Sequence, residues 1–311
     1  MTGLLHPDIP ARASLLAEGF AAARPFRHVV MDDFLEPEII AALIAEFPSF
    51  RRENAVNEHG TVGRKAAVPR LAAIGPAYRE LDRLLQHASF LQLIGHIAGI
   101  RNLVYDPDYV GGGTHENLDG QDLDVHVDFN FLPSLRLYRR LNLILFLNRE
   151  WREDWGGCLA LHKNPWNPGE DSVSSILPIA NRAVLFETTE QSWHGFSRIA
   201  LPADYSGSRK SIAVYYYTAA PPEQGAAPSH GTVYVPQPLP SRLRAGYTLR
   251  DEDIHELQDL WDRRTEQVHF LYRRELEFSE ALDIIRNSRS FRLAHTLTRS
   301  ARAIKGILRR R

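Results

Sequence analysis

The sequence contains a single cysteine, Cys158, among its 311 residues. One thiol excludes an internal disulfide framework and any zinc or iron–sulfur site that is built from several thiolates. Metal chemistry in this chain would therefore have to use imidazoles and carboxylates. The 13 histidines make such a site feasible.

Long hydrophobic runs are missing as well. No stretch approaches the about eighteen consecutive apolar residues of a membrane span, and the first residues lack the basic and then apolar pattern of a secretory signal. We therefore expect a cytoplasmic protein. With 44% hydrophobic and 24% charged residues, the composition is that of an ordinary globular protein, for which no nucleic-acid partner is predicted.

Acidic residues are absent from the C-terminal segment. Residues 284–311 contain nine Arg or Lys, which leaves 28 basic against 38 acidic residues in the remainder. Apolar residues recur there at intervals of three and four, as on one face of a helix: Leu293, Leu297, Ala301, Ile304 and Leu308. Two interpretations remain open. The segment packs on the acidic body, within one chain or across a dimer, or it is a peripheral anchor on an anionic membrane.

The hydrophobic pattern changes twice along the chain. Before residue 100 it predicts a short strand at residues 28–31 and helices at 37–46 and 76–98. From 100 to 218, short β-branched and aromatic runs are separated by Gly, Pro, Asn and Asp, which is typical of an all-β sandwich or barrel. From Asp251 onward the pattern is helical again.

These changes divide the chain into four expected regions. They are an N-terminal strand with supporting helices (1–99), a β core (100–220), a Pro-rich connection (221–250), and a C-terminal helical extension that ends in the basic tail (251–311).

The β core contains the phrase LDVHVDFN at residues 123–130, which alternates apolar and polar residues. Residues two apart lie on the same face of a strand, so His126 and Asp128 project together. With one further histidine from a neighbouring strand, they would form a 2-His-1-carboxylate metal site. The alternative is an ordinary polar strand face.

His194 is the first candidate for the third ligand. It lies at the start of a predicted strand, 66 residues after Asp128. His162 also ends a predicted strand and competes with it. His115 lies in the phrase GGGTHEN, which we expect to be a loop, and there it would contact substrate or solvent rather than metal.

The phrase SRKSIAVYYYT at residues 208–218 places Arg209 and Ser211 on one strand face. A guanidinium binds a carboxylate through two hydrogen bonds and stays charged when buried, so this pair predicts a carboxylate receptor. The alternative is an arginine on the solvated face of an edge strand.

Together these motifs resemble the Fe(II)/2-oxoglutarate-dependent oxygenases, particularly their bacterial prolyl-4-hydroxylase-like branch. The resemblance covers residues 100–218 and includes the phrases RLNLILFLN, WGGCLALH and AVLFETTEQSWHG. It implies a mainly β protein with flanking helices, whose core is a double-stranded β-helix of the jelly-roll or cupin-like type. It also implies that Fe(II) binds to His126, Asp128 and His194, and 2-oxoglutarate to Arg209 and Ser211.

The resemblance further implies the reaction. Such enzymes use O2 to convert 2-oxoglutarate into succinate and CO2 while they hydroxylate an unactivated C–H bond. A carboxylate at Asp128 favours hydroxylation or desaturation over halogenation. The prolyl hydroxylases commonly have Lys where this chain has Arg209, so prolyl specificity does not follow from the resemblance. The substrate is expected to be a small molecule or a peptide, and prolyl, amino acid and saccharide types all stay open. The alternative function is a non-catalytic cupin-like binding module associated with glycan assembly or the membrane surface.

Overall fold

The computed structural model describes residues 3–51, 66–223 and 226–291. The chain divides into two compact units, with the boundary between Gln237 and Pro238. The apolar and basic pattern predicted for residues 293–308 lies outside the described residues.

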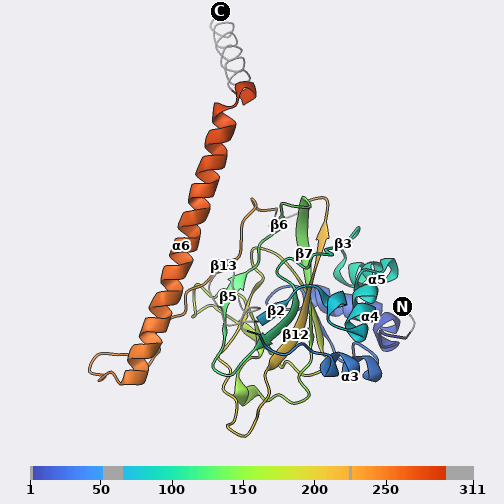
Figure 1. Cartoon of the computed structure of the whole chain (residues 1–311), viewed down its shortest axis with the longest axis horizontal. Coiled ribbons are helices and arrows are strands. Elements are labelled where there is room, and N and C mark those ends of the chain that lie inside the picture. The colour runs from blue at the N-terminus through green and yellow to red at the C-terminus, as the bar shows by residue number, and fades with distance from the viewer. Residues whose placement is uncertain (1–2, 52–65, 224–225, 292–311) are drawn as a thin grey trace, which may run out of the picture. The chain divides into compact units, whose positions relative to one another are not determined.

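The first unit contains a large antiparallel sheet of eight strands within the described residues (Figure 1). Six of these strands are hydrogen-bonded in one series, in the spatial order β1 (His28–Met31), β10 (Ala183–Glu187), β7 (Leu137–Phe146), β12 (Arg209–Thr218), β4 (Gly113–Asn117) and β2 (Ala66–Val68). Two further short strands join it: β3 (Val104–Tyr105) pairs with β12, and β6 (Phe131–Leu132) pairs with β7.

A second antiparallel sheet carries His126 and His194. Its five strands in spatial order are β13 (Val233–Tyr234), β5 (Leu123–Val127), β11 (Trp193–Phe196), β8 (Leu159–His162) and β9 (Val173–Ile176). The two sheets form the double-stranded β-helix expected from the sequence. Strand β13 comes from the Pro-rich region 221–250, which therefore contributes to the β core.

Helices cover the outer face of the large sheet. They are α1 (Asp8–Ala11), α2 (Ala13–Ala22), α3 (Pro37–Ala45), α4 (Pro76–Leu85) and α5 (Ala88–Ala98), with the 3₁₀ turn η2 (Leu71–Ala73). A second 3₁₀ turn, η3 (Glu153–Trp155), packs through Trp155 against Phe196 of the smaller sheet. Figure 1 shows α3, α4 and α5 together on one side of this sheet. The predicted strand 28–31 is confirmed, and the predicted helix 37–46 is confirmed to within one residue.

Alternation along the strands separates two apolar layers. Leu141, Leu143 and Leu145 of β7 are buried in the core shared with the helices. Phe146 belongs instead to a cluster with Leu161 of the smaller sheet, which lies between the two sheets. This second layer is the barrel interior, and its polar end holds the candidate site.

The helical prediction for 76–98 is confirmed except at a break, and one local prediction is wrong. The break divides the segment into α4 and α5, because His87 has extended backbone angles and its imidazole accepts a hydrogen bond from Ser89 N at 3.2 Å, which caps α5. The phrase around His115 is strand β4 rather than a loop, and His115 lies opposite Ser211 of β12. Gly113 begins this strand at φ 102°, where a Cβ would collide with the carbonyl oxygen of Val68.

The second unit contains helix α6 (Asp251–Asn287), which confirms the helix predicted from Asp251 onward. Its first turn is fixed by Asp253, whose carboxylate accepts hydrogen bonds from Arg250 N at 2.9 Å and from the Tyr247 hydroxyl at 2.8 Å. Within the described ranges, no helix combines the length and the apolar character needed to cross a bilayer.

Candidate metal centre

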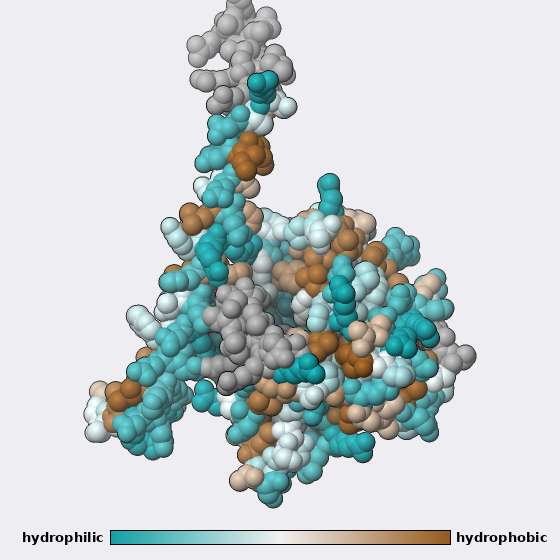
Figure 2. Space-filling model, in the orientation of Figure 1, coloured by the Kyte–Doolittle hydropathy of each residue, from teal (hydrophilic) through white to brown (hydrophobic). Residues whose placement is uncertain are grey.

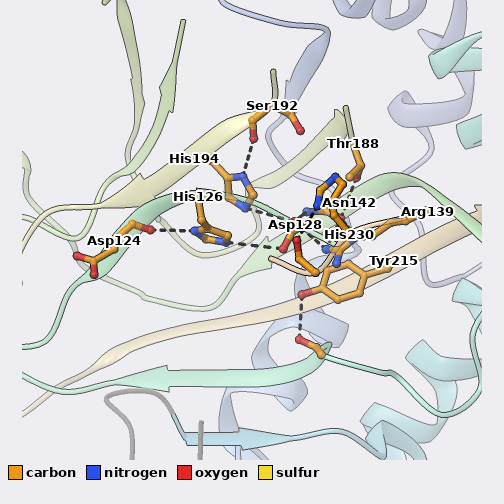
Figure 3. A network of polar contacts seen from close by, with 12 residues as sticks. Asp124, His126, Asp128, Arg139, Asn142, Thr188, Ser192, His194, Tyr215 and His230 are labelled. Carbon is orange, nitrogen blue, oxygen red and sulfur yellow. Dashed lines mark hydrogen bonds and ion pairs between the residues drawn. The ribbon is translucent and has the colours of Figure 1, made fainter. Parts of the chain in front are cut away.

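The structure brings His126, Asp128 and His194 together at one end of the barrel interior (Figure 3). Strands β5 and β11 are antiparallel neighbours, and His194 is the Cα partner of His126. The two imidazole ring centres lie 4.3 Å apart. One ligand atom from each of the three side chains lies within 4.8 Å of the other two, and all three residues are buried.

A glycine allows the two strands to approach. A Cβ at Gly195 would lie 2.6 Å from the carbonyl oxygen of Leu123, closer than any side chain tolerates. The pairing of β11 with β5 is irregular between His194 and Phe196, as in a β-bulge. The residue after His194 must therefore be small for this imidazole to face His126.

Both imidazoles are oriented by the backbone two residues earlier. His126 Nδ1 lies 2.8 Å from the Asp124 carbonyl oxygen, and His194 Nδ1 lies 2.9 Å from the Ser192 carbonyl oxygen. A carbonyl oxygen only accepts, so each Nδ1 carries the hydrogen. Each Nε2 then presents a lone pair toward Asp128, as metal-binding histidines do.

The carboxylate of Asp128 is held by two donors from strand β7. Arg139 Nη2 donates to Oδ2 at 2.9 Å, and Asn142 Nδ2 donates to the same oxygen at 2.8 Å. Burial by itself would raise the pKa of Asp128, but Arg139, His194 and His126 together outweigh it, and the pKa lies well below its ordinary value. Asp128 is therefore an anion in the barrel interior.

Arg139 is fixed on three sides. Its Nε and Nη2 donate to Asn142 Oδ1 at 3.0 and 2.7 Å, and its guanidinium lies 3.4 Å from the ring centre of Tyr215. The pairing of β7 with β12 shifts register here, since Tyr216 is opposite Leu141 while Tyr217 is opposite Arg139. This bulge turns Arg139 to the interior. We did not predict Arg139 or Asn142 as site residues.

His194 is uncharged at neutral pH. Burial, and then the proximity of His126, lower the pKa of His194 to about 4. Two imidazole nitrogens and one carboxylate are the donor set that suits a divalent transition-metal ion. The residues present thus fit the Fe(II) that the sequence predicts.

Arg209 is a buried cation elsewhere on β12. It is 4% exposed, its Nε donates to the Gly157 carbonyl oxygen at 2.6 Å, and its guanidinium lies 4.1 Å from the ring centre of Phe196. Burial lowers its pKa to about 9, so it stays protonated at neutral pH. Among the residues that the structure describes, no carboxylate forms an ion pair with it. A buried guanidinium of this kind fits an anionic ligand.

The competing histidines lie elsewhere. His162 is the Cα partner of Trp193, next to the position that pairs with His194, so it points to the other face of the smaller sheet. Its Nδ1 lies 2.7 Å from Asp171 Oδ2. His115, opposite Ser211 in the other sheet, is likewise not part of the metal-binding group.

The segment that contains β13 also reaches the site. Tyr234 is the Cα partner of His126, and the two rings lie 5.2 Å apart between centres. His230 N donates to Asn130 Oδ1 at 3.0 Å, and His230 Nε2 lies 2.8 Å from Glu190 Oε1. The sequence signals this segment only weakly, because VYV is a short run between prolines.

Two facing antiparallel sheets with a buried His–Asp–His group between them define a class, the metal-dependent proteins built on a double-stranded β-helix. Residues 113–217 match the sequence model of the 2OG-Fe(II) oxygenase superfamily. The matched residues include all three members of the His–Asp–His group.

Several known proteins are similar. Prolyl 3-hydroxylase OGFOD1 of Mus musculus is 24% identical over 208 residues, which cover 61% of this chain and 37% of the mouse protein. A prolyl-4-hydroxylase of Pseudomonas putida has a TM-score of 0.43 and 18% identity, covering 73% of this chain and 98% of that one. A prolyl hydroxylase of Trichoplax adhaerens, solved with a hypoxia inducible factor peptide, has a TM-score of 0.46 and 16% identity, covering 68% and 90%.

Proposed function

We propose that this protein is an Fe(II)- and 2-oxoglutarate-dependent oxygenase that hydroxylates a C–H bond of its substrate, with succinate and CO2 as co-products. The observation that carries the proposal is the buried group of His126, Asp128 and His194 inside a domain of the 2OG-Fe(II) oxygenase superfamily. A non-catalytic binding module, the alternative, would have no need to keep an ionised carboxylate in this interior.

In this proposal His126 and His194 bind Fe(II) through Nε2, and Asp128 binds it through a carboxylate oxygen. Support comes from the hydrogen bonds that fix each Nδ1 to a carbonyl and direct each Nε2 inward. Since Oδ2 of Asp128 already accepts two hydrogen bonds, Oδ1 is the oxygen expected to ligate the metal.

Arg209 and Ser211 are proposed to bind the carboxylate of 2-oxoglutarate that is farther from the iron. Both are buried on β12, and the strand register directs them to the same side. The Nε of Arg209 is occupied by Gly157, which leaves the two terminal nitrogens to bind both carboxylate oxygens. Ser211 would add a hydroxyl donor.

The bound iron, with 2-oxoglutarate and O2, supplies the oxidising chemistry. The chain's own residues hold these groups and exclude water. Arg139 and Asn142 keep Asp128 ionised and fixed in one orientation, and Phe146 and Phe186 line the dry interior next to His194 and Arg209. Pre-organised ligands in a water-excluded site are what this chemistry requires of a protein.

A peptidyl proline is the first substrate class to test, because the curated relative is named a prolyl 3-hydroxylase. The chain spans only 37% of that protein's length. Free amino acids and saccharides therefore belong in the same screen, which should detect succinate release together with a mass gain of one oxygen in the substrate.

The proposal is tested by succinate production from 2-oxoglutarate in the presence of Fe(II) and O2. The assay is run with each candidate of the substrate screen. Asp128→Ala should abolish succinate production. Equal rates for the wild type and this variant would show that the oxygenase assignment is wrong.

A further inference from the structure

Helix α6 exposes an apolar stripe along most of its length. It spans 37 residues, which corresponds to about 55 Å at 1.5 Å per residue. Figure 2 shows apolar side chains at intervals along it. Ten large apolar side chains on this helix are 42–73% exposed, and seven of them form the stripe: Ile254, Trp261, Val268, Leu271, Phe278, Leu282 and Ile285. An exposed apolar surface of this kind marks an interaction site.

The stripe has the seven-residue period of a coiled coil. One set of positions recurs every seven residues, and a second set follows each of them by three residues, as positions a and d of a heptad do. The a positions are Ile254, Trp261, Val268, Glu275 and Leu282. The d positions are Leu257, Arg264, Leu271, Phe278 and Ile285.

Only two of these ten positions are charged, and their charges are opposite. They are Arg264, a d position, and Glu275, an a position. In an antiparallel pair of helices, a positions of one helix pack against d positions of the other. A charged pair in such a seam fixes the register, because any other register leaves each charge against an apolar side chain.

We propose that α6 pairs with α6 of a second copy of this chain as an antiparallel coiled coil. Centring the pair between His269 and Phe270, close to the middle of the helix, aligns the two helices over their full length. That register places Arg264 against the second copy's Glu275, and the reverse at the symmetric position. It also pairs each of the remaining a positions with an apolar d position: Ile254 with Ile285, Trp261 with Phe278, Val268 with Leu271, and Leu282 with Leu257.

The parallel arrangement is disfavoured by the same two residues. A parallel dimer in register would place Arg264 against Arg264 and Glu275 against Glu275, so both pairs would be repulsive in a partly desolvated seam. The opposite face of α6 carries the acidic residues Asp262, Glu266, Glu277 and Glu280. Those side chains stay in water in the antiparallel dimer, and they oppose binding of this helix to an anionic bilayer.

The experiment is sedimentation equilibrium of the full-length chain. The wild type should be dimeric. Arg264→Glu and Glu275→Arg should each raise the dimer dissociation constant by at least about tenfold, because each creates two repulsive pairs per dimer. The double variant, with both charges exchanged, should restore the wild-type dissociation constant. Arg273→Glu is the matched control on the opposite face and should leave it unchanged.

Three results would overturn the proposal. A monomeric wild type would mean that another part of the same chain covers the stripe. Failure of the double variant to restore dimerisation would exclude the antiparallel register, because exchange of the two charges leaves a parallel dimer equally repulsive. An equal effect of Arg273→Glu would show that the dissociation constant depends on net charge rather than on the residues of the seam. Circular dichroism of each variant confirms that the helix is retained, and the proposal does not depend on the oxygenase activity.

Discussion

Arg139 and Asp128 form a buried ion pair, with 2.9 Å between Nη2 and Oδ2, beside the two histidines of the candidate metal centre. The arginine is 2% exposed. The pair explains how a carboxylate stays ionised in the barrel interior before any metal binds.

Replacement of Arg139 by methionine should therefore destabilise the metal-free protein. Breaking a buried ion pair by removing one partner costs about 3–5 kcal/mol, since the other charge is left uncompensated. A divalent ion such as Co(II) would supply the missing positive charge, so its addition should recover more stability in this variant than in the wild type. Urea denaturation with and without Co(II) measures both effects.

The control for Arg139→Met is Arg149→Met, at an exposed arginine just beyond the same strand. It removes one positive charge from the surface and should change the unfolding free energy by less than about 0.5 kcal/mol. If both variants lose equal stability, the ion pair with Asp128 is not the cause.

Removal of His194 should abolish metal binding, whereas removal of His162 should not. His194→Ala deletes a nitrogen of the three-residue group, and loss of a ligand should exceed the about 10–100-fold affinity loss seen when only a ligand's supporting partner is removed. His162→Ala deletes a histidine on the adjacent strand whose partner is Asp171. Titration with Co(II), followed by its visible absorption, compares the two. The reverse result would show that His162, and not His194, is the third ligand.

Arg209→Lys should weaken 2-oxoglutarate binding while iron binding is kept. One ammonium cannot replace two parallel hydrogen bonds, and a charged hydrogen bond contributes about 1.5–3 kcal/mol, so the dissociation constant should rise roughly 10- to 150-fold. Calorimetric titration of the anaerobic Mn(II)-loaded protein with 2-oxoglutarate measures this.

Lys210→Ala is the neighbouring control for the 2-oxoglutarate titration. Lys210 lies on the other face of β12, where its Nζ is 3.7 Å from Glu116 Oε1. Its removal should leave 2-oxoglutarate affinity as in the wild type. Unchanged 2-oxoglutarate affinity in Arg209→Lys would show that another residue binds this carboxylate.

The basic segment 292–311 is predicted to confer salt-sensitive binding to anionic membranes. It contains seven Arg or Lys and no acidic residue, and each basic residue near an anionic surface contributes about 1 kcal/mol. Flotation with phosphatidylserine vesicles should carry more of the full-length chain than of a chain ending at Phe291. Equal flotation of the two at low salt would favour the alternative, in which this segment packs on protein.

The period of two along a strand allowed much of the site to be predicted. It places His126 with Asp128 and Arg209 with Ser211 whatever the rest of the fold is, because side chains two residues apart share a face. The β-rich character of residues 100–218 followed from composition and turn residues in the same way. The helical heptads of residues 254–285 are also local and can be read from spacing alone.

Sequence periodicity could not separate His194 from His162. Both end or begin short strands of similar composition. Only the pairing of β11 between β5 and β8 decides that His194 faces His126 while His162 faces away. The break in the helix at 76–98 was missed for a related reason, since the apolar stripe continues across His87 while the capping hydrogen bond interrupts the backbone.

Arg139 shows most clearly what only the tertiary structure decided. Strict alternation in LYRRLNLILF would put Arg139 on the face of Leu141 and Leu143, against the helices, and opposite to Asn142. The register shift between β7 and β12 adds one residue at this point and turns Arg139 into the barrel, onto Asp128. A bulge depends on the partner strand, so local sequence determined which side chains are available, and strand pairing determined which of them meet.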